Sequence, residues 1–151
     1  MHMPHRKTLP HEVPLWVDPQ KVVYFITINC AARESNQLAL PQLAELLFET
    51  VEHRQQKGLW WPHLVLVMPD HVHALISFPP SGKPLDSIIS KWKEWTAKKL
   101  GIVWQRDFFE HRLRKEESFR EKADYVLENP VRAGLAKRWE DWPYMFIADP
   151  W

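Results

Sequence analysis

The chain has 151 residues with a formal net charge of +1, and 45% of the residues are hydrophobic and 26% charged. This length suits one domain with a single core, and no apolar run approaches the ~18 residues that span a membrane, so no membrane partner is expected. The one cysteine, Cys30, excludes an internal disulfide and a cysteine-based structural zinc site, and it favours a cytoplasmic protein.

The first part of the chain predicts an arm, a strand and a helix. Residues 1–20 are rich in Pro and show no sustained period, so we expect an extended N-terminal arm. The β-branched and aromatic run Lys21–Cys30 predicts a buried strand. Apolar residues recur at helical spacing over Pro41–Lys57, and Gly58 follows as a stop signal, which predicts a helix.

Two apolar runs on either side of a Pro-Asp turn predict a β-hairpin, roughly Pro62–Met68 and His71–Phe78. Residues two apart on a strand point to the same face, so His71 and His73 should project together. Two imidazoles on one strand beside a turn are half of a divalent metal site. The alternative is a histidine pair on a half-exposed strand with no ligand role, which is more common for this pattern taken alone.

The second part predicts a helix over Leu85–Leu100, a strand over Ile102–Leu113 and a helix over Glu117–Glu128 that Pro130 interrupts. The resulting order β-α-β-β-α-β, followed by a helix, is typical of a ferredoxin-like α+β fold with an antiparallel sheet. We therefore expect one domain over residues 1–151, with a core over 21–136 and an aromatic tail over 137–151 that packs across it.

A basic segment lies between Lys83 and Lys115, with nine Lys or Arg against four Asp or Glu. Such a segment in a near-neutral chain indicates either a phosphate-binding surface or an ordinary solvated helix face. Charge alone does not separate these two interpretations.

The last predicted helix carries Tyr125 and Asn129, which are four residues apart and share one face. Taken singly, Tyr125 is an ordinary core or surface aromatic, and Asn129-Pro130 is a helix break with Asn as a cap. The combination of a histidine pair on a central strand with a tyrosine and an amide on one helix face favours a shared site.

These motifs carry a resemblance to a known family. The residues Met68-Pro69-Asp70-His71-Val72-His73 resemble the His-hydrophobe-His motif of the HUH superfamily. The segments Trp104–Leu113 and Tyr125–Leu135 resemble the single-tyrosine transposases, and within them the REP-associated tyrosine transposases. The resemblance covers about Tyr24 to Tyr144, with three motifs in the right order, and it implies the same ferredoxin-like fold.

The resemblance also implies a chemistry and a site. It implies that His71 and His73 bind a divalent metal, Mg²⁺ or Mn²⁺, that Asn129 completes the protein ligands, and that Tyr125 is the nucleophile. Relatives often have Gln at the third ligand position, and Asn129 is shorter. The implied activity is metal-dependent cleavage and rejoining of single-stranded DNA through a 5′-phosphotyrosine intermediate, at hairpins of repetitive extragenic palindromes. His111 is a candidate general base, and the protein is expected to act as a monomer or a homodimer.

The candidate DNA contacts come from the basic segment: Lys91, Lys93, Lys98, Lys99, Arg106, Arg112 and Arg114. Three tryptophans interleaved with these charges are candidates to stack on unpaired bases, namely Trp92, Trp95 and Trp104. The alternative for each is core packing, which is the more common role for Trp92 and Trp104.

Two other functions fit parts of the sequence. The first is a domesticated protein that binds DNA hairpins without catalysis, and the intact Tyr125, His71 and His73 argue against it. The second is a different metal hydrolase or a nucleotide-binding histidine protein. The histidine-triad pattern would need a further histidine where Leu75 stands, so this alternative fails locally.

Overall fold

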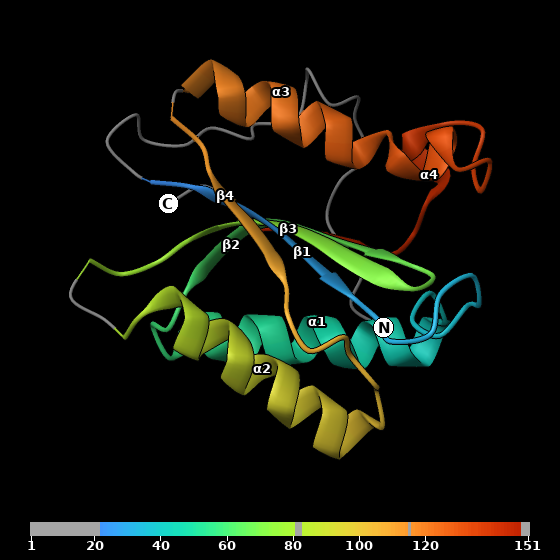
Figure 1. The fold of residues 1–151 in the computed structure, drawn as a ribbon. Helices are drawn as coiled ribbons and strands as arrows, with labels where there is room; N and C mark the ends of the chain where they lie inside the picture. The colour runs from blue at the N-terminus through green and yellow to red at the C-terminus, as the bar shows by residue number, and fades with distance from the viewer. Residues whose placement is uncertain (1–21, 81–82, 115, 149–151) are drawn as a thin grey trace.

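One five-stranded antiparallel sheet separates two layers of helix (Figure 1). The strand order is β4-β1-β3-β2-β5, and the strands are β1 (Tyr24–Asn29), β2 (Trp61–Met68), β3 (His71–Ser77), β4 (Phe109–Arg112) and β5 (Met145–Ile147). One face is covered by α1 (Pro41–Gln56) and α2 (Leu85–Leu100), and the other by α3 (Glu116–Leu127) and the short α4 (Asn129–Arg132). A 3-10 turn, η1 (Trp139–Asp141), precedes β5.

This computed structural model describes residues 22–80, 83–114 and 116–148, so the expected arm over residues 1–20 lies outside the described residues. The order of the first four strands and their crossover helices confirms the predicted ferredoxin-like α+β fold. Within the described ranges, none of the helices combines the length and the apolar composition that a membrane crossing requires.

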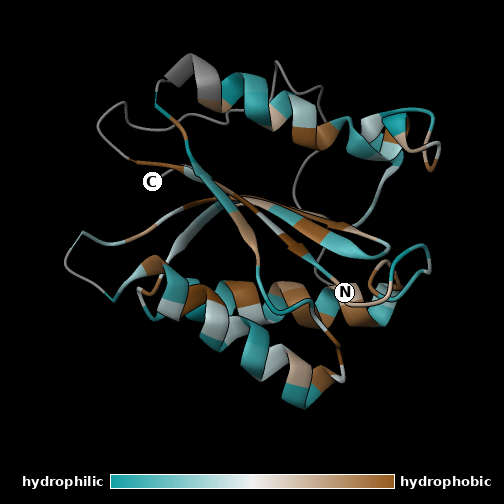
Figure 2. Ribbon diagram, viewed as in Figure 1, coloured by the Kyte–Doolittle hydropathy of each residue, from teal (hydrophilic) through white to brown (hydrophobic). Residues whose placement is uncertain are grey.

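The alternation of side chains along the strands divides the interior into two cores. On β3, Leu75 packs into the core under α3, whereas Val72, Ala74 and Ile76 pack into the core over α1 and α2. Hydrophobic residues are concentrated on the strands and on the helix faces turned toward them (Figure 2). Since His71 and His73 share the alternation of Leu75, both imidazoles lie on the α3 side of the sheet.

The fourth strand is shorter than the sequence predicts. Instead of running over Ile102–Leu113, β4 spans only Phe109–Arg112, and Trp104 makes an isolated bridge to Cys30. The reason lies in α2, where the ammonium of Lys93 binds the backbone carbonyls of Gln105 and Arg106 at 2.8 Å each. These carbonyls bind a side chain instead of β1, so the pairing with β1 is interrupted between the Trp104 bridge and β4.

The last part of the chain ends α3 and adds a fifth strand to the sheet. Pro130 has no N–H to continue the helical hydrogen-bond ladder, so α3 ends at Leu127 and a separate turn, α4, begins at Asn129. The segment expected to be an aromatic tail supplies β5, which pairs with β2. The indole of Trp142 donates to the Val67 carbonyl at 3.0 Å, which fixes this segment against β2.

Candidate functional site

The two histidines of the hairpin lie side by side at the centre of the sheet. The ring centroids of His71 and His73 are 4.7 Å apart, and the ring planes are inclined by 77°. β3 is paired on both sides, with Asn29 and Thr27 of β1 opposite the two histidines on one edge. The backbone that carries the pair is therefore held rigidly, and the spacing of the two imidazoles is set by the strand.

Each histidine has one ring nitrogen engaged by a neighbour. His71 Nδ1 lies 2.8 Å from Asp70 Oδ1, and His73 Nδ1 lies 2.9 Å from Thr27 Oγ1. In the tautomer that donates from Nδ1, each ring keeps the lone pair of Nε2 free for a cation. A carboxylate or hydroxyl behind a ligating imidazole fixes its tautomer and orientation, as is usual for histidines that bind metals.

Asp70 is itself held in place. Arg33 Nε donates to Asp70 Oδ2 at 2.9 Å, and the Glu34 amide donates to the same oxygen at 2.8 Å. Burial by itself raises the pKa of this carboxyl, but the hydrogen bonds that it accepts, chiefly from Arg33 and His71, hold the pKa well below its usual range. Glu34 adopts a φ of 68°, a left-handed conformation that costs a non-glycine residue roughly 1–2 kcal/mol. This backbone strain occurs at the amide that binds Asp70.

His73 is buried and neutral. The pKa of its imidazole is lowered to about 3, first by burial and then by the positive charges of its neighbours His71, Arg132 and Lys122. Its ring stacks on Phe25, with the centroids 5.5 Å apart. A neutral imidazole is the form that coordinates a metal, so His73 is ready to act as a ligand at neutral pH.

The aromatic ring of Tyr125 is half exposed on α3 and is surrounded by cations. Lys122 Nζ lies 5.3 Å from its ring centroid, and the Arg132 guanidinium carbon lies 4.0 Å from it. Arg132 also donates a hydrogen bond to the backbone carbonyl of Tyr125. Lys122 additionally lies over the ring of Phe25, at 4.7 Å, which is the same ring that stacks on His73. One run of contacts therefore joins the tyrosine to the histidine pair.

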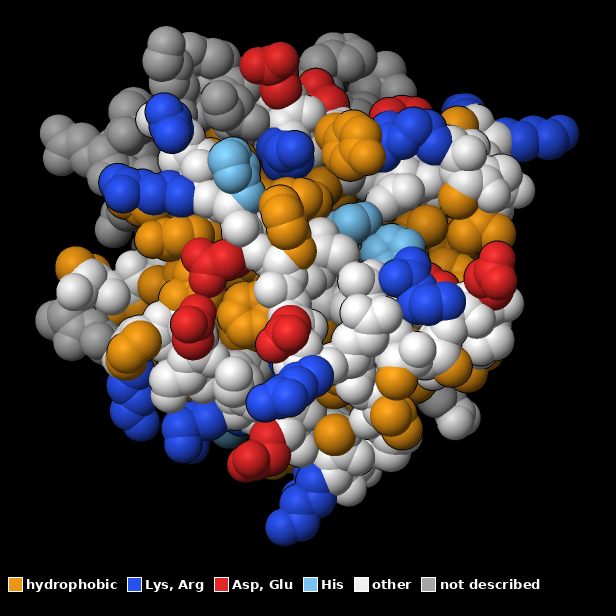
Figure 3. Space-filling model, in the orientation of Figure 1, with side chains coloured by type: hydrophobic (Ala, Val, Ile, Leu, Met, Phe, Trp, Pro, Cys, Tyr) orange, Lys and Arg blue, Asp and Glu red, His pale blue; other side chains and the backbone are white. Residues whose placement is uncertain are grey.

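Tyr125 lines an open cavity of about 430 Å³ between β4 and α3. The other residues around this cavity are His111, Leu113, Arg114, Glu121 and Lys122. On the same face of the molecule, histidine side chains reach the surface among Lys and Arg side chains (Figure 3). The cavity thus combines a phenol, an imidazole and cationic side chains, a combination suited to an anionic ligand.

Asn129 stands at the start of α4 and is half-buried. The Glu128 amide donates to the Asp124 carbonyl and the Arg132 amide to the Glu128 carbonyl, so helical hydrogen bonding continues around the break. Asn129 therefore still follows Tyr125 by about one helical turn. Within the described residues no group of three or more His, Cys, Asp or Glu side chains is placed to hold a metal, so a cation here needs Asn129 or water besides the two imidazoles.

The structure distributes the seven candidate DNA contacts over different surfaces. Arg114 lines the cavity beside Tyr125. Arg106 is exposed in the segment before β4, and Arg112 alternates with His111 on β4 and so points to the α2 side. The exposed lysines of α2 lie on the opposite side of the sheet from the histidine pair, and they are Lys91, Lys98 and Lys99.

The expectation for Lys93 is corrected by its contacts. Its ammonium is buried and binds the carbonyls of Gln105 and Arg106 at 2.8 Å, with the ring of Phe108 5.7 Å away. It fastens the segment before β4 to α2 and leaves no ammonium face for a phosphate. Trp92 is likewise a core residue, and its indole donates to Thr50 at 2.9 Å.

Several residues of the site were not found from the sequence. Lys122 and Arg132 belong to the surroundings of Tyr125, and Arg33 and Thr27 hold the groups behind the two histidines. Arg132 follows Tyr125 by seven residues, about two helical turns, and this spacing was a usable signal. Arg33 and Thr27 come from β1 and the loop after it, so only the sheet pairing brings them to the site.

No family model matches the chain, but individual relatives do. A REP-associated tyrosine transposase of Escherichia coli K12 is 29% identical over 130 residues, which cover 80% of this chain and 73% of that protein. A Haemophilus influenzae protein that carries the same family name is 25% identical over 140 residues, covering 81% of this chain and 77% of its own.

Solved structures with a similar fold also match the chain. The structure of a REP-associated tyrosine transposase bound to a REP hairpin matches with a TM-score of 0.72 and 26% identity, over 85% of this chain and 79% of that one. A protein of Deinococcus radiodurans shares the fold alone, with a TM-score of 0.53 and 19% identity, over 72% of this chain and 90% of that one. The two curated relatives and the hairpin-bound structure confirm the resemblance to the REP-associated tyrosine transposases.

Proposed function

Because this chain is similar to the REP-associated tyrosine transposases over 80% of its length, we propose that it is a metal-dependent enzyme that cleaves and rejoins single-stranded DNA at a hairpin. The hairpin partner is carried over from the solved relative, which is bound to a REP hairpin. The strands to be joined are expected to flank a palindrome of the same kind.

One observation carries the proposal. Lys122 and Arg132 lie against the exposed ring of Tyr125, and the positive charges of the same two residues act on buried His73. A nucleophile of the phosphoryl-transfer type needs cations around the phosphate that it attacks, because negative charge gathers on the phosphate oxygens. The half-exposed tyrosine and the histidine pair are thus parts of one electropositive site.

The reaction follows from the groups in this site. The Tyr125 hydroxyl attacks phosphorus, the bond from phosphorus to the 3′ oxygen breaks, and the strand is left with a 5′-phosphotyrosine link and a free 3′-hydroxyl. The phenol proton must be removed, and His111, which lines the same cavity, is the candidate base. Attack of a 3′-hydroxyl on the phosphotyrosine reverses these bond changes, so the linkage is conserved for strand transfer.

The donor set of the histidine pair suits a divalent cation, Mg²⁺ or Mn²⁺. His71 and His73 would hold it through Nε2, and Asn129 through its side-chain oxygen. Such a cation, when bound, polarises the scissile phosphate and stabilises charge in the transition state. The contribution of the chain itself is to present two imidazoles in fixed positions and to surround Tyr125 with Lys122 and Arg132.

The phosphates nearest to the reaction are assigned to the cations of the Tyr125 cavity. Arg114 and Lys122 line it, and Arg132 covers the tyrosine ring. This assignment moves the reactive part of the DNA path from α2 to the surface between β4 and α3.

Covalent capture tests the proposal. A labelled hairpin oligonucleotide with single-stranded flanks is incubated with the protein and Mn²⁺ or Mg²⁺, and adducts are detected by denaturing electrophoresis. The wild type should form an adduct, whereas Tyr125→Phe should form none and still bind DNA, since the ring is kept and only the oxygen is lost. Tyr24→Phe is the matched control and should form the adduct.

Two results would contradict the proposal. An adduct that persists in Tyr125→Phe would place the nucleophile at another residue. A wild-type protein that binds the hairpin tightly but never forms an adduct, with either metal, would instead indicate a hairpin-binding protein without catalysis.

A further inference from the structure

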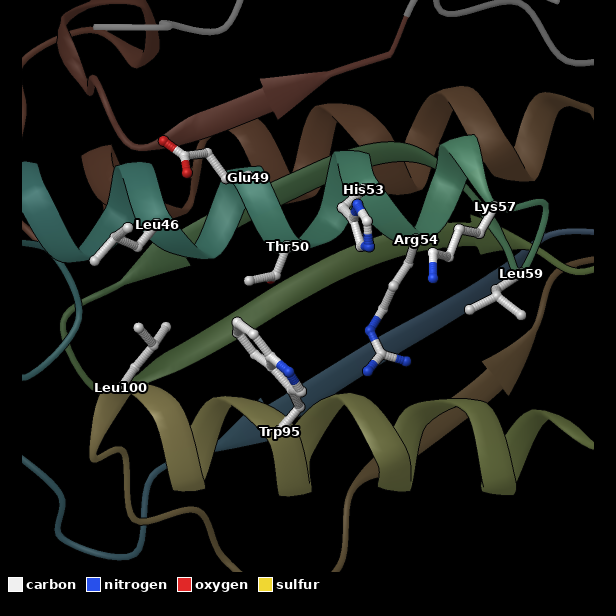
Figure 4. A pocket seen from close by; sticks show the side chains of 9 residues that line it. All are labelled: Leu46, Glu49, Thr50, His53, Arg54, Lys57, Leu59, Trp95 and Leu100. Atoms are coloured by element: carbon white, nitrogen blue, oxygen red, sulfur yellow. The ribbon is translucent and has the colours of Figure 1, made fainter.

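A second cavity lies on the opposite side of the sheet, between α1 and α2. It has a volume of about 580 Å³, within the range of roughly 300–1,000 Å³ that is usual for small-molecule sites. Figure 4 shows Arg54 reaching down from α1 and Trp95 rising from α2, so that these two side chains enter the groove from opposite helices. The other lining residues are Leu46, Glu49, Thr50, His53, Lys57, Leu59 and Leu100.

The aromatic part of this groove is available for contact. Trp95 is 41% exposed, whereas Trp92 on the inner face of the same helix is 3% exposed. Core packing therefore accounts for Trp92 but leaves a large part of the Trp95 indole open. Leu46 and Leu100 lie at one end of the groove in Figure 4 and make this end apolar.

The cationic part of the groove is not neutralised from within. Arg54 is half-buried, and among the described residues its guanidinium has no ion-pair partner. Glu49 is the one carboxylate in the lining, and it points away from Arg54 (Figure 4). Burial lowers the pKa of Arg54, because water that would solvate its charge has been partly removed. A partly desolvated guanidinium without a carboxylate favours an anionic partner.

Further cations flank the same tryptophan along α2. Lys91 precedes Trp95 by four residues, and Lys98 and Lys99 follow it by three and four, so all of them share the outer side of the helix. Lys57 adds a cation from the end of α1. An exposed indole with positive charge on both sides matches the chemistry of an unpaired nucleotide, which has a flat base and an anionic phosphate.

We propose that the α1–α2 groove binds an unpaired nucleotide of single-stranded DNA, with its base against Trp95 and its phosphate at Arg54 and Lys57. The proposal rests on the proposed function, since it takes DNA as the substrate. It adds a second contact surface on the face of the sheet opposite to Tyr125. A strand that leaves the hairpin would be held there, apart from the phosphate that reacts.

Binding of an oligothymidylate, which forms no hairpin, tests the groove without any cleavage step. The titration uses the full chain with Tyr125→Phe, without metal, and follows fluorescence anisotropy. Trp95→Ala should weaken binding roughly 5- to 100-fold, because one stacking contact is lost. Arg54→Gln should reduce the slope of log K against log salt by about one, because one phosphate contact is lost.

The matched control is Arg138→Gln. Arg138 follows α4, does not line the groove, and pairs with Asp141. It should leave both affinity and salt slope unchanged. In a parallel measurement, an oligonucleotide carrying 5-iodouracil is photo-crosslinked, and the attachment point is mapped by mass spectrometry. The crosslink should fall on the α2 peptide that contains Trp95.

The outcomes are decisive in both directions. Unchanged affinity in Trp95→Ala and Arg54→Gln, with circular dichroism showing folded variants, would overturn the proposal. Crosslinks confined to other peptides would overturn it as well, and so would equal competition by polyglutamate, which offers charge without a base. Because no cleavage is involved, these results are independent of adduct formation, and a missing adduct would count against the proposed enzyme alone.

Discussion

The guanidinium of Arg132 lies over the ring of Tyr125, 4.0 Å from its centroid, and donates a hydrogen bond to the carbonyl of the same residue. The same side chain thus touches both the ring and the backbone of the proposed nucleophile. This arrangement depends on the break after α3, because Pro130 offers no N–H and α4 starts a new turn that carries Arg132. The ring is held by a contact on its face and by the backbone that carries it.

Arg132 is therefore predicted to position Tyr125. Arg132→Lys keeps the charge but loses the planar group that can stack on the ring and reach the carbonyl together. The single-turnover rate of adduct formation at saturating DNA should fall about 10- to 100-fold, since a cation–π contact and a charged hydrogen bond are both weakened. Affinity for the hairpin should change much less. Equal rates for Arg132→Lys and the wild type would remove this role.

The metal ligands should rank in a defined order. His71→Ala or His73→Ala should reduce metal-dependent cleavage more than Asn129→Ala, because imidazole is the stronger ligand and water can replace an amide oxygen. Asp70→Asn should weaken metal affinity about 10- to 100-fold by releasing the His71 ring. Titration of each variant with Mn²⁺, followed by adduct yield, measures the order. Full activity of the wild type in excess chelator would exclude a metal from the reaction.

Lys93 should contribute to stability rather than to DNA binding. Lys93→Ala leaves the carbonyls of Gln105 and Arg106 without their donor and should lower the free energy of unfolding by about 2–4 kcal/mol. Lys91→Ala, at an exposed position of the same helix, should stay within about 0.5 kcal/mol of the wild type. Urea unfolding measures both. A Lys93 variant as stable as the Lys91 variant would show that these hydrogen bonds contribute nothing.

The two basic surfaces should separate in function. Arg114→Gln combined with Lys122→Gln should reduce the rate of adduct formation, because both side chains line the cavity of Tyr125. Replacing Lys91, Lys98 and Lys99 with Ala should instead weaken the binding of hairpins with single-stranded flanks and flatten its salt dependence. The comparison uses rates at saturating DNA and affinities at several salt concentrations. The opposite pattern would place the reacting phosphate over α2.

The sequence alone determined the element order β-α-β-β-α-β that is typical of a ferredoxin-like fold, because hydrophobic period and turn residues are local signals that act on each element separately. The same holds for the histidine pair, since the period of a strand places residues two apart on one face wherever the strand lies. The spacing of Tyr125 and Asn129 was likewise visible along the chain.

Only the tertiary structure decided what surrounds these residues. Thr27 reaches His73, and Arg33 reaches Asp70, because β1 pairs with β3 in one register, and the hydrophobic period of each strand does not report that register. The sequence predicted that Lys93 is a surface charge. Its ammonium instead binds two backbone carbonyls of the segment before β4, and the sequence pattern did not predict the path of that segment. The lysines of α2 and the cations near Tyr125 are close in sequence but lie on opposite faces of the sheet, because a crossover to β4 separates them. Burial and charge pairing depend on contacts between distant segments, and those contacts exist only in the folded chain.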